Sequence, residues 1–232
     1  MGRKKNIGKF QQQQKLEQLK AEKKKRNRMV IGILAAVLVL AVLVGVLIWA
    51  LSGSNDDGDT VDTSDAIKVA LEIKDYGKIT LELYPNEAPI TVENFVNYVE
   101  DGFYDGLTFH RIIEDFMIQG GDPTGTGTGD SSLKKIKGEF SANGVDNDLK
   151  FERGVIGMAR TDAPDSASSQ FFIMHKTTPS LDGAYAAFGK VIDGMDVVDA
   201  IATCEKTDTV DAYGNHYVPA ETVIIEKAYI VE

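Results

Sequence analysis

The feature that most constrains this 232-residue chain is an uncharged apolar run of 22 residues, 30–51. At a rise of about 1.5 Å per residue, a helix of this length crosses the roughly 30 Å hydrocarbon layer of a bilayer with a small tilt. Trp49 lies near the end of the run, where an indole ring suits the membrane interface. The sequence therefore predicts a single transmembrane helix over residues 30–51.

The segments on either side of this run carry opposite charge. Residues 1–29 contain eleven Lys and Arg against two Glu, a net charge of +9, whereas residues 52–232 contain fourteen against thirty-three acidic residues, a net charge of −19. Because basic flanks stay on the cytoplasmic side, we predict a basic cytoplasmic tail over 1–29 and an extracytoplasmic remainder in the cell membrane. A cleaved signal peptide, which would release a secreted protein, remains the alternative, although its apolar region is usually about 7–15 residues long.

The exported part divides again by composition. Residues 52–65 are rich in Gly, Ser and Asp, which bury little surface, so this stretch is predicted to be an acidic flexible linker. The remaining residues, 66–232, are numerous enough to build one hydrophobic core. The chain has one cysteine, Cys204, and therefore forms no intrachain disulfide.

Apolar periodicity in 66–232 indicates a mainly β domain. Alternation predicts strands, and helical spacing predicts two helices, the first with Thr91 as its N-cap. The predicted strands are 69–73, 79–83, 108–112, 116–119, 154–158, 171–175, 187–192 and 223–231, and the predicted helices are 91–100 and 195–203. Many strands with few helices favour a closed barrel or a sandwich over βαβ units.

Motifs for hydrolysis or nucleotide binding do not occur. The chain contains no GxSxG or HExxH sequence, and the glycine-rich run at 125–129 does not end in GK[ST]. Acidic residues near that run also disfavour phosphate, so we interpret it as a thin loop beside a groove. We expect no cofactor, no metal and no nucleic-acid partner.

An arginine in an apolar stretch is the most informative chemical feature. FHRIIEDFMIQGGD, residues 109–122, places Arg111 among residues typical of a buried strand. A guanidinium stays charged, so burying it is costly unless the site uses it. Strand alternation predicts that Arg111 faces outward and that its neighbour His110 faces the opposite side.

Four ordered segments resemble cyclophilin-type peptidyl-prolyl cis–trans isomerases: FHRIIEDFMIQGGDPTGTGTG, GVIGMAR, SSQFFI and LDGAYAAFGKVIDGMDVVDAI. The resemblance covers about residues 67–232. It implies a closed eight-stranded antiparallel β-barrel with two capping α-helices and a groove on its outer face. It also implies an enzyme that speeds rotation about X-Pro bonds and needs neither metal nor cofactor.

The resemblance assigns a role to each matching site residue. Arg111 is the catalytic arginine, and Gln119 binds the substrate backbone and orients that arginine. The implied proline pocket consists of Phe116, Met117, Phe172 and Leu181, and the groove for the preceding residue consists of the backbone at Ala159 and Arg160 with the Gln170 side chain. The chain departs from many members at Ser180 (Trp), Tyr185 (His) and Arg160 (Asn). Tyr185 would lie at the proline pocket, and Arg160 would add charge beside the peptide path.

The expected protein is a monomeric, membrane-anchored foldase. Its partners would be proline-containing unfolded or nascent exported polypeptides, and its N-terminal helix would anchor it in the membrane. The alternative is a membrane-anchored proline-peptide-binding module with little catalytic activity. The presence of Arg111 favours the enzyme, because a pure binder gains little from a costly guanidinium.

Overall fold

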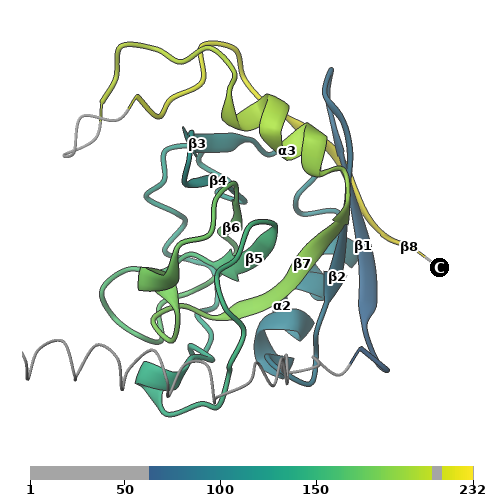
Figure 1. Cartoon of the computed structure of the whole chain (residues 1–232), viewed down its shortest axis with the longest axis vertical. Helices are drawn as coiled ribbons and strands as arrows, with labels where there is room; N and C mark the ends of the chain where they lie inside the picture. Colours follow the sequence, from purple (N-terminus) through teal and green to yellow (C-terminus); the bar gives the residue numbers. More distant parts are fainter. Residues whose placement is uncertain (1–62, 211–215, 232) are drawn as a thin grey trace, which may run out of the picture. The chain divides into compact units, whose positions relative to one another are not determined.

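The computed structural model describes residues 63–210 and 216–231, and these residues form a mainly β domain (Figure 1). The predicted tail, the predicted transmembrane helix and all but the last residues of the predicted linker lie outside the described residues. Within the described part, no helix has both the length and the apolar character needed to cross a membrane. The strands are β1 (Ile67–Ile73), β2 (Gly77–Leu83), β3 (Phe109–Ile113), β4 (Met117–Gly120), β5 (Val155–Met158), β6 (Phe171–Met174), β7 (Ala187–Asp193) and β8 (Ile225–Val231). The helices are α2 (Pro89–Glu100), α3 (Met195–Ala202) and the short 3₁₀ turns η1 (Ser141–Asn143) and η2 (Pro179–Leu181).

All eight strands belong to one antiparallel sheet in the order β3-β4-β6-β5-β7-β2-β1-β8. The sheet curves into a half-barrel (Figure 1). The prediction of eight antiparallel strands with two helices is confirmed, but the prediction of a closed barrel is not. Within the described residues, β3 and β8 share no ladder; the gap is crossed by an isolated bridge between Thr108 and Ile224 and by the Phe109 N–H, which donates to the Val223 carbonyl at 3.0 Å.

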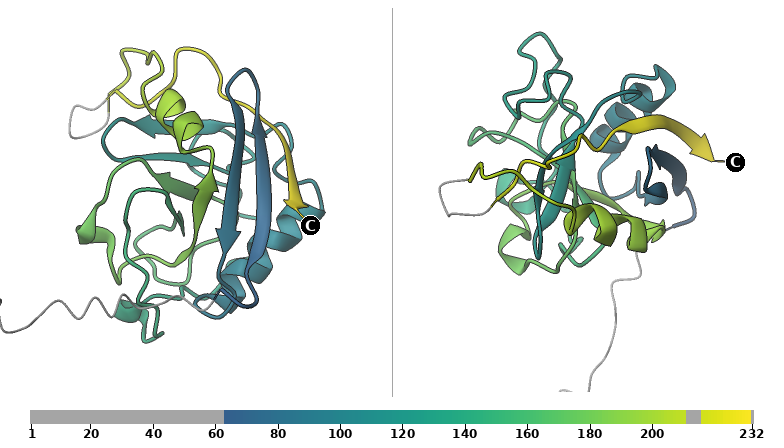
Figure 2. Two further views of the ribbon diagram at one scale, coloured as in Figure 1. Left: turned by 45° about the vertical axis from the view of Figure 1, so that its right-hand side comes forward. Right: turned by 90° about the horizontal axis from the view of Figure 1, so that it is seen from above.

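The core lies inside the curved sheet. Phe95 of α2 lies at its centre, fully buried, with its ring centroid 5.0 Å from Tyr104, 5.3 Å from Phe188 and 5.4 Å from Phe171. Tilted and edge-on ring pairs of this kind add stabilisation beyond the apolar area that they bury. Helix α2 is thereby fixed at one end of the sheet, and α3 lies toward the other end (Figures 1 and 2).

Helix α2 begins earlier than the sequence predicted. Its first residue is Pro89, whose fixed φ suits the first helical position, and its N-cap is Ala88. Thr91 was predicted to be the N-cap and is instead inside the first turn. The Glu139 carboxylate accepts hydrogen bonds from the Ile90 N–H at 3.0 Å and from the Thr91 N–H and hydroxyl at 2.7 Å each. Glu139, which is distant in sequence, therefore caps the N-terminus of α2 in place of a neighbouring side chain.

Candidate active site

A second apolar cluster lies on the other face of the sheet from the core. Along β6, Phe171 and Ile173 belong to the core, whereas Phe172 and Met174 belong to the second cluster, as strand alternation requires. Its buried members are Ile113, Met117, Phe151, Val155, Phe172, Met174 and Ala187, and its partly buried members are Phe116, Leu149, Ala159, Leu181, Tyr185 and Tyr217. The structure thus brings together all the residues that were predicted to line a proline pocket.

Aromatic rings form the wall of this cluster. The Phe172 ring stacks on Phe151, with centroids 5.5 Å apart and planes 25° apart, and meets the edge of Tyr185 at 5.8 Å and 90°. Phe151 is 1% exposed and is a member of this cluster that no sequence motif marked. It lies in a segment without regular structure, so no periodic pattern marked it.

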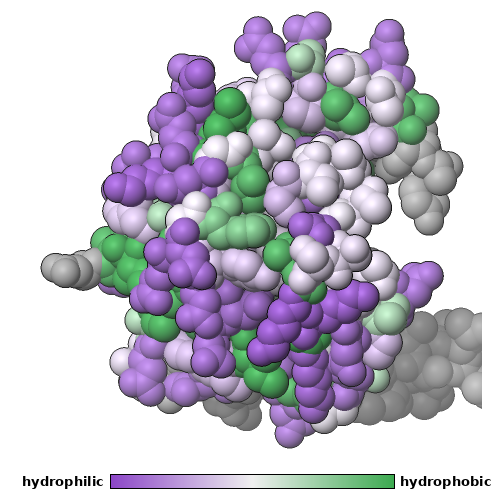
Figure 3. Space-filling view, turned by 180° about the vertical axis from the view of Figure 1, so that it is seen from behind, coloured by the Kyte–Doolittle hydropathy of each residue, from purple (hydrophilic) through white to green (hydrophobic). Residues whose placement is uncertain are grey.

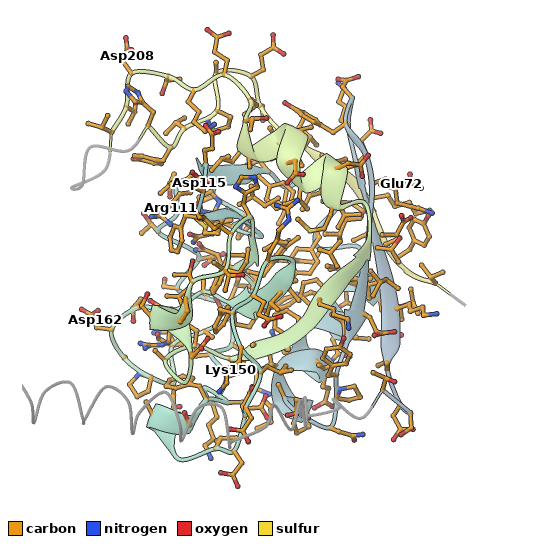
Figure 4. All side chains as sticks on the ribbon, viewed as in Figure 1. Glu72, Arg111, Asp115, Lys150, Asp162 and Asp208 are labelled. Atoms are coloured by element: carbon orange, nitrogen blue, oxygen red, sulfur yellow. The ribbon has the colours of Figure 1, made fainter. Side chains whose placement is uncertain are left out.

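Arg111 lies at the border of the apolar cluster. It pairs with Gln119 across β3 and β4, and its Nη1 donates to Gln119 Oε1 at 3.5 Å. The same nitrogen lies 3.7 Å from the Met117 Sδ, and the guanidinium carbon lies 5.9 Å from the centre of the Phe116 ring. Figure 4 shows Arg111 on the β3 side of the molecule with Asp115, away from Glu72 on β1. A half-buried cation is therefore held directly beside an apolar surface.

Hydrogen bonds between side chains fix the orientation of Gln119. Its Nε2 donates to Gln170 Oε1 at 3.0 Å, which leaves Gln119 Oε1 to face Arg111. Gln170 Nε2 in turn donates to the Gly127 carbonyl at 3.4 Å. The predicted site residues Arg111, Gln119 and Gln170 are therefore connected in one chain that ends at the glycine-rich loop.

That loop is organised around one buried carboxylate. Asp122, 1% exposed, accepts hydrogen bonds from the N–H groups of Thr124 at 2.9 Å, Gly127 at 2.7 Å and Gly129 at 3.2 Å. Burial raises the pKa of Asp122, but hydrogen bonds from these groups outweigh burial and leave the pKa below its ordinary value. Asp122 is therefore ionised at neutral pH and holds the loop beside Gln170.

His110 does not face away from Arg111, as alternation had predicted. The register between β3 and β4 shifts between Phe109 and Arg111, so one extra residue, His110, is accommodated as a bulge. Phe109 keeps its place in the core, and both His110 and Arg111 line the same cavity. The prediction for His110 was wrong because strict alternation does not survive a bulge.

The His110 imidazole lies beneath the glycine-rich loop. A Cβ at Gly127 would approach its Nε2 to 3.4 Å, and neither ring nitrogen makes a well-formed hydrogen bond with a described residue. Burial lowers the pKa of His110 and the Arg111 charge lowers it further, while the Asp122 carboxylate and the Thr108 backbone oppose the shift in part. His110 is consequently a neutral neighbour of Arg111 near pH 7.

The Arg160 side chain makes its polar contacts with backbone carbonyls of the protein. Its Nε and Nη2 donate to the Ala184 carbonyl at 3.0 and 2.7 Å, and its Nη1 donates to the Thr161 carbonyl at 2.8 Å. The guanidinium lies 4.9 Å from the Phe140 ring centre and 4.7 Å from that of Tyr185. The preceding residue, Ala159, has its N–H bonded to the Gln170 carbonyl at 2.9 Å. The prediction that Arg160 adds charge beside the peptide path stays a prediction, with the guanidinium held by these contacts.

A cavity of about 700 Å³ adjoins Arg111 at the β3 end of the sheet. It is lined by Thr108–Arg111, Gln119, the loop at 125–128, the segment 217–219 and Thr222. Tyr217 belongs both to this lining and to the apolar cluster, a role that no motif marked because it is distant in sequence from β3. Within the described residues, no group of three or more His, Cys, Asp or Glu side chains is arranged to hold a metal ion.

Comparisons with known proteins agree with this arrangement. Residues 68–230 match the family model described as cyclophilin type peptidyl-prolyl cis-trans isomerase/CLD. The chain is 44% identical over 163 residues to the peptidyl-prolyl cis-trans isomerase cyp18 of Streptomyces antibioticus, covering 67% of this chain and 93% of that relative. It is 42% identical over 161 residues to the isomerase A of Dickeya dadantii, covering 67% and 80%.

Solved structures give the same result. A crystal structure of a Cryptosporidium parvum cyclophilin type peptidyl-prolyl cis-trans isomerase superposes with a TM-score of 0.63 at 32% identity, covering 72% of this chain and 98% of that one. The same protein in the presence of the dipeptide Ala-Pro gives a TM-score of 0.62. The chain belongs to the cyclophilin family and is a peptidyl-prolyl cis–trans isomerase.

Proposed function

We propose that this isomerase holds the substrate proline ring against the second apolar cluster and uses Arg111 to stabilise the rotating bond. The observation that carries the proposal is the position of the guanidinium, beside Phe116 and Met117 and paired with Gln119. The apolar wall offers a dry surface for the ring, and the cation lies where the neighbouring amide would rotate. The Cryptosporidium relative, crystallised in the presence of Ala-Pro, supports a short X-Pro peptide as the ligand class.

The proposed mechanism follows from the electronic structure of the amide. Delocalisation of the nitrogen lone pair creates a rotation barrier of about 18–20 kcal/mol, and uncatalysed X-Pro exchange takes tens to hundreds of seconds. When the amide twists, the lone pair localises on nitrogen, which becomes a better hydrogen-bond acceptor. An N–H of Arg111 directed at that nitrogen binds the twisted state more tightly than either planar state, which lowers the barrier. No bond breaks, so no nucleophile or general base takes part.

Gln119 and Gln170 keep Arg111 in place in this proposal. A guanidinium has several rotatable bonds, and holding it in one geometry removes the reorganisation that the reaction would otherwise require. The hydrogen-bond chain from Arg111 through Gln119 and Gln170 to the Gly127 carbonyl supplies that restraint. Gln119 would also contact the substrate backbone when a peptide is present.

We also propose that the enzyme acts on proline-containing unfolded or nascent polypeptides exported across the membrane. The basic segment 1–29, the apolar segment 30–51 and the acidic remainder support a single-pass anchor with the isomerase domain outside the cytoplasm. An anchor raises the local concentration of the enzyme where exported chains emerge.

Replacing Arg111 with alanine tests the catalytic proposal. With the full chain in detergent, we expect Arg111→Ala to lower kcat for cis-to-trans exchange of an Ala-Pro peptide about 100-fold, because one preorganised donor contributes about 2.7–4 kcal/mol in comparable sites. Peptide affinity should change little, because the apolar wall remains. Arg153→Ala is the matched control, since Arg153 is an exposed arginine paired with Asp199 outside the site.

Two outcomes would change the proposal. If Arg111→Ala exchanged the peptide as fast as the wild type, the guanidinium would have no role in the barrier. If the wild type bound the peptide without accelerating exchange, the chain would instead be a proline-peptide-binding module.

A further inference from the structure

The turn between β3 and β4 carries Phe116 to its place beside Arg111. The turn consists of residues 114–116, and Figure 4 shows Asp115 at the same end of the sheet as Arg111. Asp115 has a φ of 59°, in the left-handed region, which costs a residue with a side chain roughly 1–2 kcal/mol. Such a conformation persists only where the surrounding structure holds it. The turn therefore depends on contacts from outside β3 and β4.

The residue that follows β6 supplies these contacts. The Phe116 carbonyl accepts a hydrogen bond from the His175 N–H at 2.9 Å, and the Asp115 N–H donates to Nδ1 of the His175 imidazole at 2.9 Å. Any residue except proline at position 175 could form the first bond, because it uses only the backbone. The second bond requires a side-chain acceptor at the place of Nδ1. The hold on Asp115 is therefore specific to the His175 side chain.

The other ring nitrogen of His175 faces a different element. Nε2 lies 3.3 Å from Oδ1 of Asp199 on α3, and the His175 side chain is 13% exposed. Because Nδ1 accepts a hydrogen bond, it carries no hydrogen, and the hydrogen of the neutral ring is on Nε2, on the side of Asp199. The imidazole thus connects α3 to the turn in one orientation.

We propose that His175 is a positioning residue that acts through Asp115 to hold the Phe116 ring in the proline pocket. The proposal rests on the proposed function, which places the substrate proline ring against the apolar cluster that includes Phe116. The Phe116 ring is partly buried, and its centre lies 5.9 Å from the guanidinium carbon of Arg111. A loosened turn would leave this ring to be ordered when the peptide binds, which costs about 0.5–1.5 kcal/mol for one side chain.

Three substitutions separate the Nδ1 contact from the bulk of the imidazole. Asparagine carries its acceptor oxygen on Cγ, as histidine carries Nδ1, whereas glutamine carries it one bond further out and alanine has none. With the full chain in detergent, we expect His175→Ala and His175→Gln to raise KM for an Ala-Pro peptide about fivefold, equivalent to about 1 kcal/mol. His175→Asn should keep the wild-type KM. The kcat should stay within about twofold in all three, because the loss concerns binding and not the rotating bond.

Hydrogen exchange of the Asp115 amide measures the contact independently of the reaction. We expect NMR of the full chain to show exchange about tenfold faster in His175→Ala and His175→Gln than in the wild type, because the N–H loses its acceptor. His175→Asn should exchange at the wild-type rate. If the alanine variant does not fold, the asparagine and glutamine variants alone decide the result, since they differ by one methylene.

Lys176→Ala is the matched control. The Lys176 ammonium lies 3.6 Å from Oδ1 of Asp115, and the two side chains are 61% and 71% exposed. An exposed ion pair of this kind contributes little. Lys176→Ala should therefore keep both the KM and the hydrogen-exchange rate of the wild type. Replacing Arg153, which pairs with Asp199, likewise leaves the Nδ1 acceptor in place.

The outcomes separate this proposal from the proposed function. Equal KM values for His175→Asn and His175→Gln, or faster hydrogen exchange at Asp115 with no change in KM, would overturn the positioning role. Either result leaves the proposed function standing if Arg111→Ala still slows isomerisation. If Arg111→Ala isomerises the peptide at the wild-type rate while the His175 variants behave as expected, the proposed role of Arg111 fails and the hold of His175 on the turn remains.

Discussion

Arg160 contacts the second apolar cluster through a neighbouring ring. Its guanidinium lies between Phe140 and Tyr185 and donates two hydrogen bonds to the Ala184 carbonyl. Tyr185 in turn meets Phe172 edge-on in the wall of the apolar cluster. A planar cation of this kind can stack and form directed hydrogen bonds at once, which fixes the Tyr185 ring before substrate arrives. We therefore regard Arg160 as a positioning residue.

Lysine at this position should loosen the pocket without removing charge. We expect Arg160→Lys to raise KM for an Ala-Pro peptide about fivefold, equivalent to about 1 kcal/mol, because an ammonium cannot reproduce the stacked, forked contact. The kcat should stay close to the wild-type value, since Arg111 and Gln119 are untouched. Steady-state exchange kinetics measure both constants, with Arg153→Lys as control. A loss confined to kcat would show that Arg160 acts on the rotating bond and not on the pocket.

Arg111 and Gln119 were both predicted to belong to the site, and the structure places them opposite each other on paired strands. Their catalytic roles stay predictions. His110 was misplaced because a bulge shifts the register by one residue, and nothing in FHRII marks the bulge. The contacts of Arg160 could not be predicted, because the direction of a long side chain after a strand depends on its partners, and Phe140 and Tyr185 are 20 and 25 positions away.

At the scale of elements, the start of α2 depends on a side chain from elsewhere. Helix N-termini leave N–H groups without intrahelical partners, and Ala88 at the N-cap offers no side-chain acceptor. Glu139, 2% exposed, fills this need with both carboxylate oxygens. Because α2 carries Phe95 into the centre of the core, the contact couples a loop to the packing of the whole sheet.

Removing this carboxylate should destabilise the domain. We expect Glu139→Ala to lower the free energy of unfolding by about 2 kcal/mol, because it leaves buried donors of the first turn of α2 without partners. Chemical denaturation of the full chain measures the change. Glu93→Ala is the control, since Glu93 is exposed on the same helix and should change stability by less than about 0.5 kcal/mol. Equal effects of the two substitutions would argue against the capping role.

The elements themselves were predictable, whereas their ends and their closure were not. Apolar alternation identified all eight strands, because each one presents residues to the core on at least one face. The start of α2 could not be placed, since its acceptor lies 48 residues beyond Thr91. Closure of the barrel between β3 and β8 could not be predicted either. It depends on the number of hydrogen bonds between these two edge strands, and apolar periodicity within each strand does not show whether the two strands pair.

At the scale of the whole molecule, net charge divides the chain into parts of opposite sign. The face shown in Figure 3 is mostly hydrophilic, with hydrophobic residues in separate spots, as expected for a domain bathed in water. Residues 52–232 carry a net charge of −19, and residues 1–29 carry +9. Anionic lipid headgroups repel acidic segments and attract basic ones, so we expect the two parts of the chain to respond to a membrane surface in opposite ways.

Deleting the apolar run tests the proposed anchor. We expect the full chain to remain with membranes after a high-salt wash and protease added to intact cells to digest residues 66–232, because 22 uncharged residues insert with the basic flank inside. A chain lacking residues 30–51 should be soluble and protected inside the cell. Fractionation, protease accessibility and the mass of the mature protein check this. A soluble exported product without its N-terminal residues would instead identify a cleaved signal peptide.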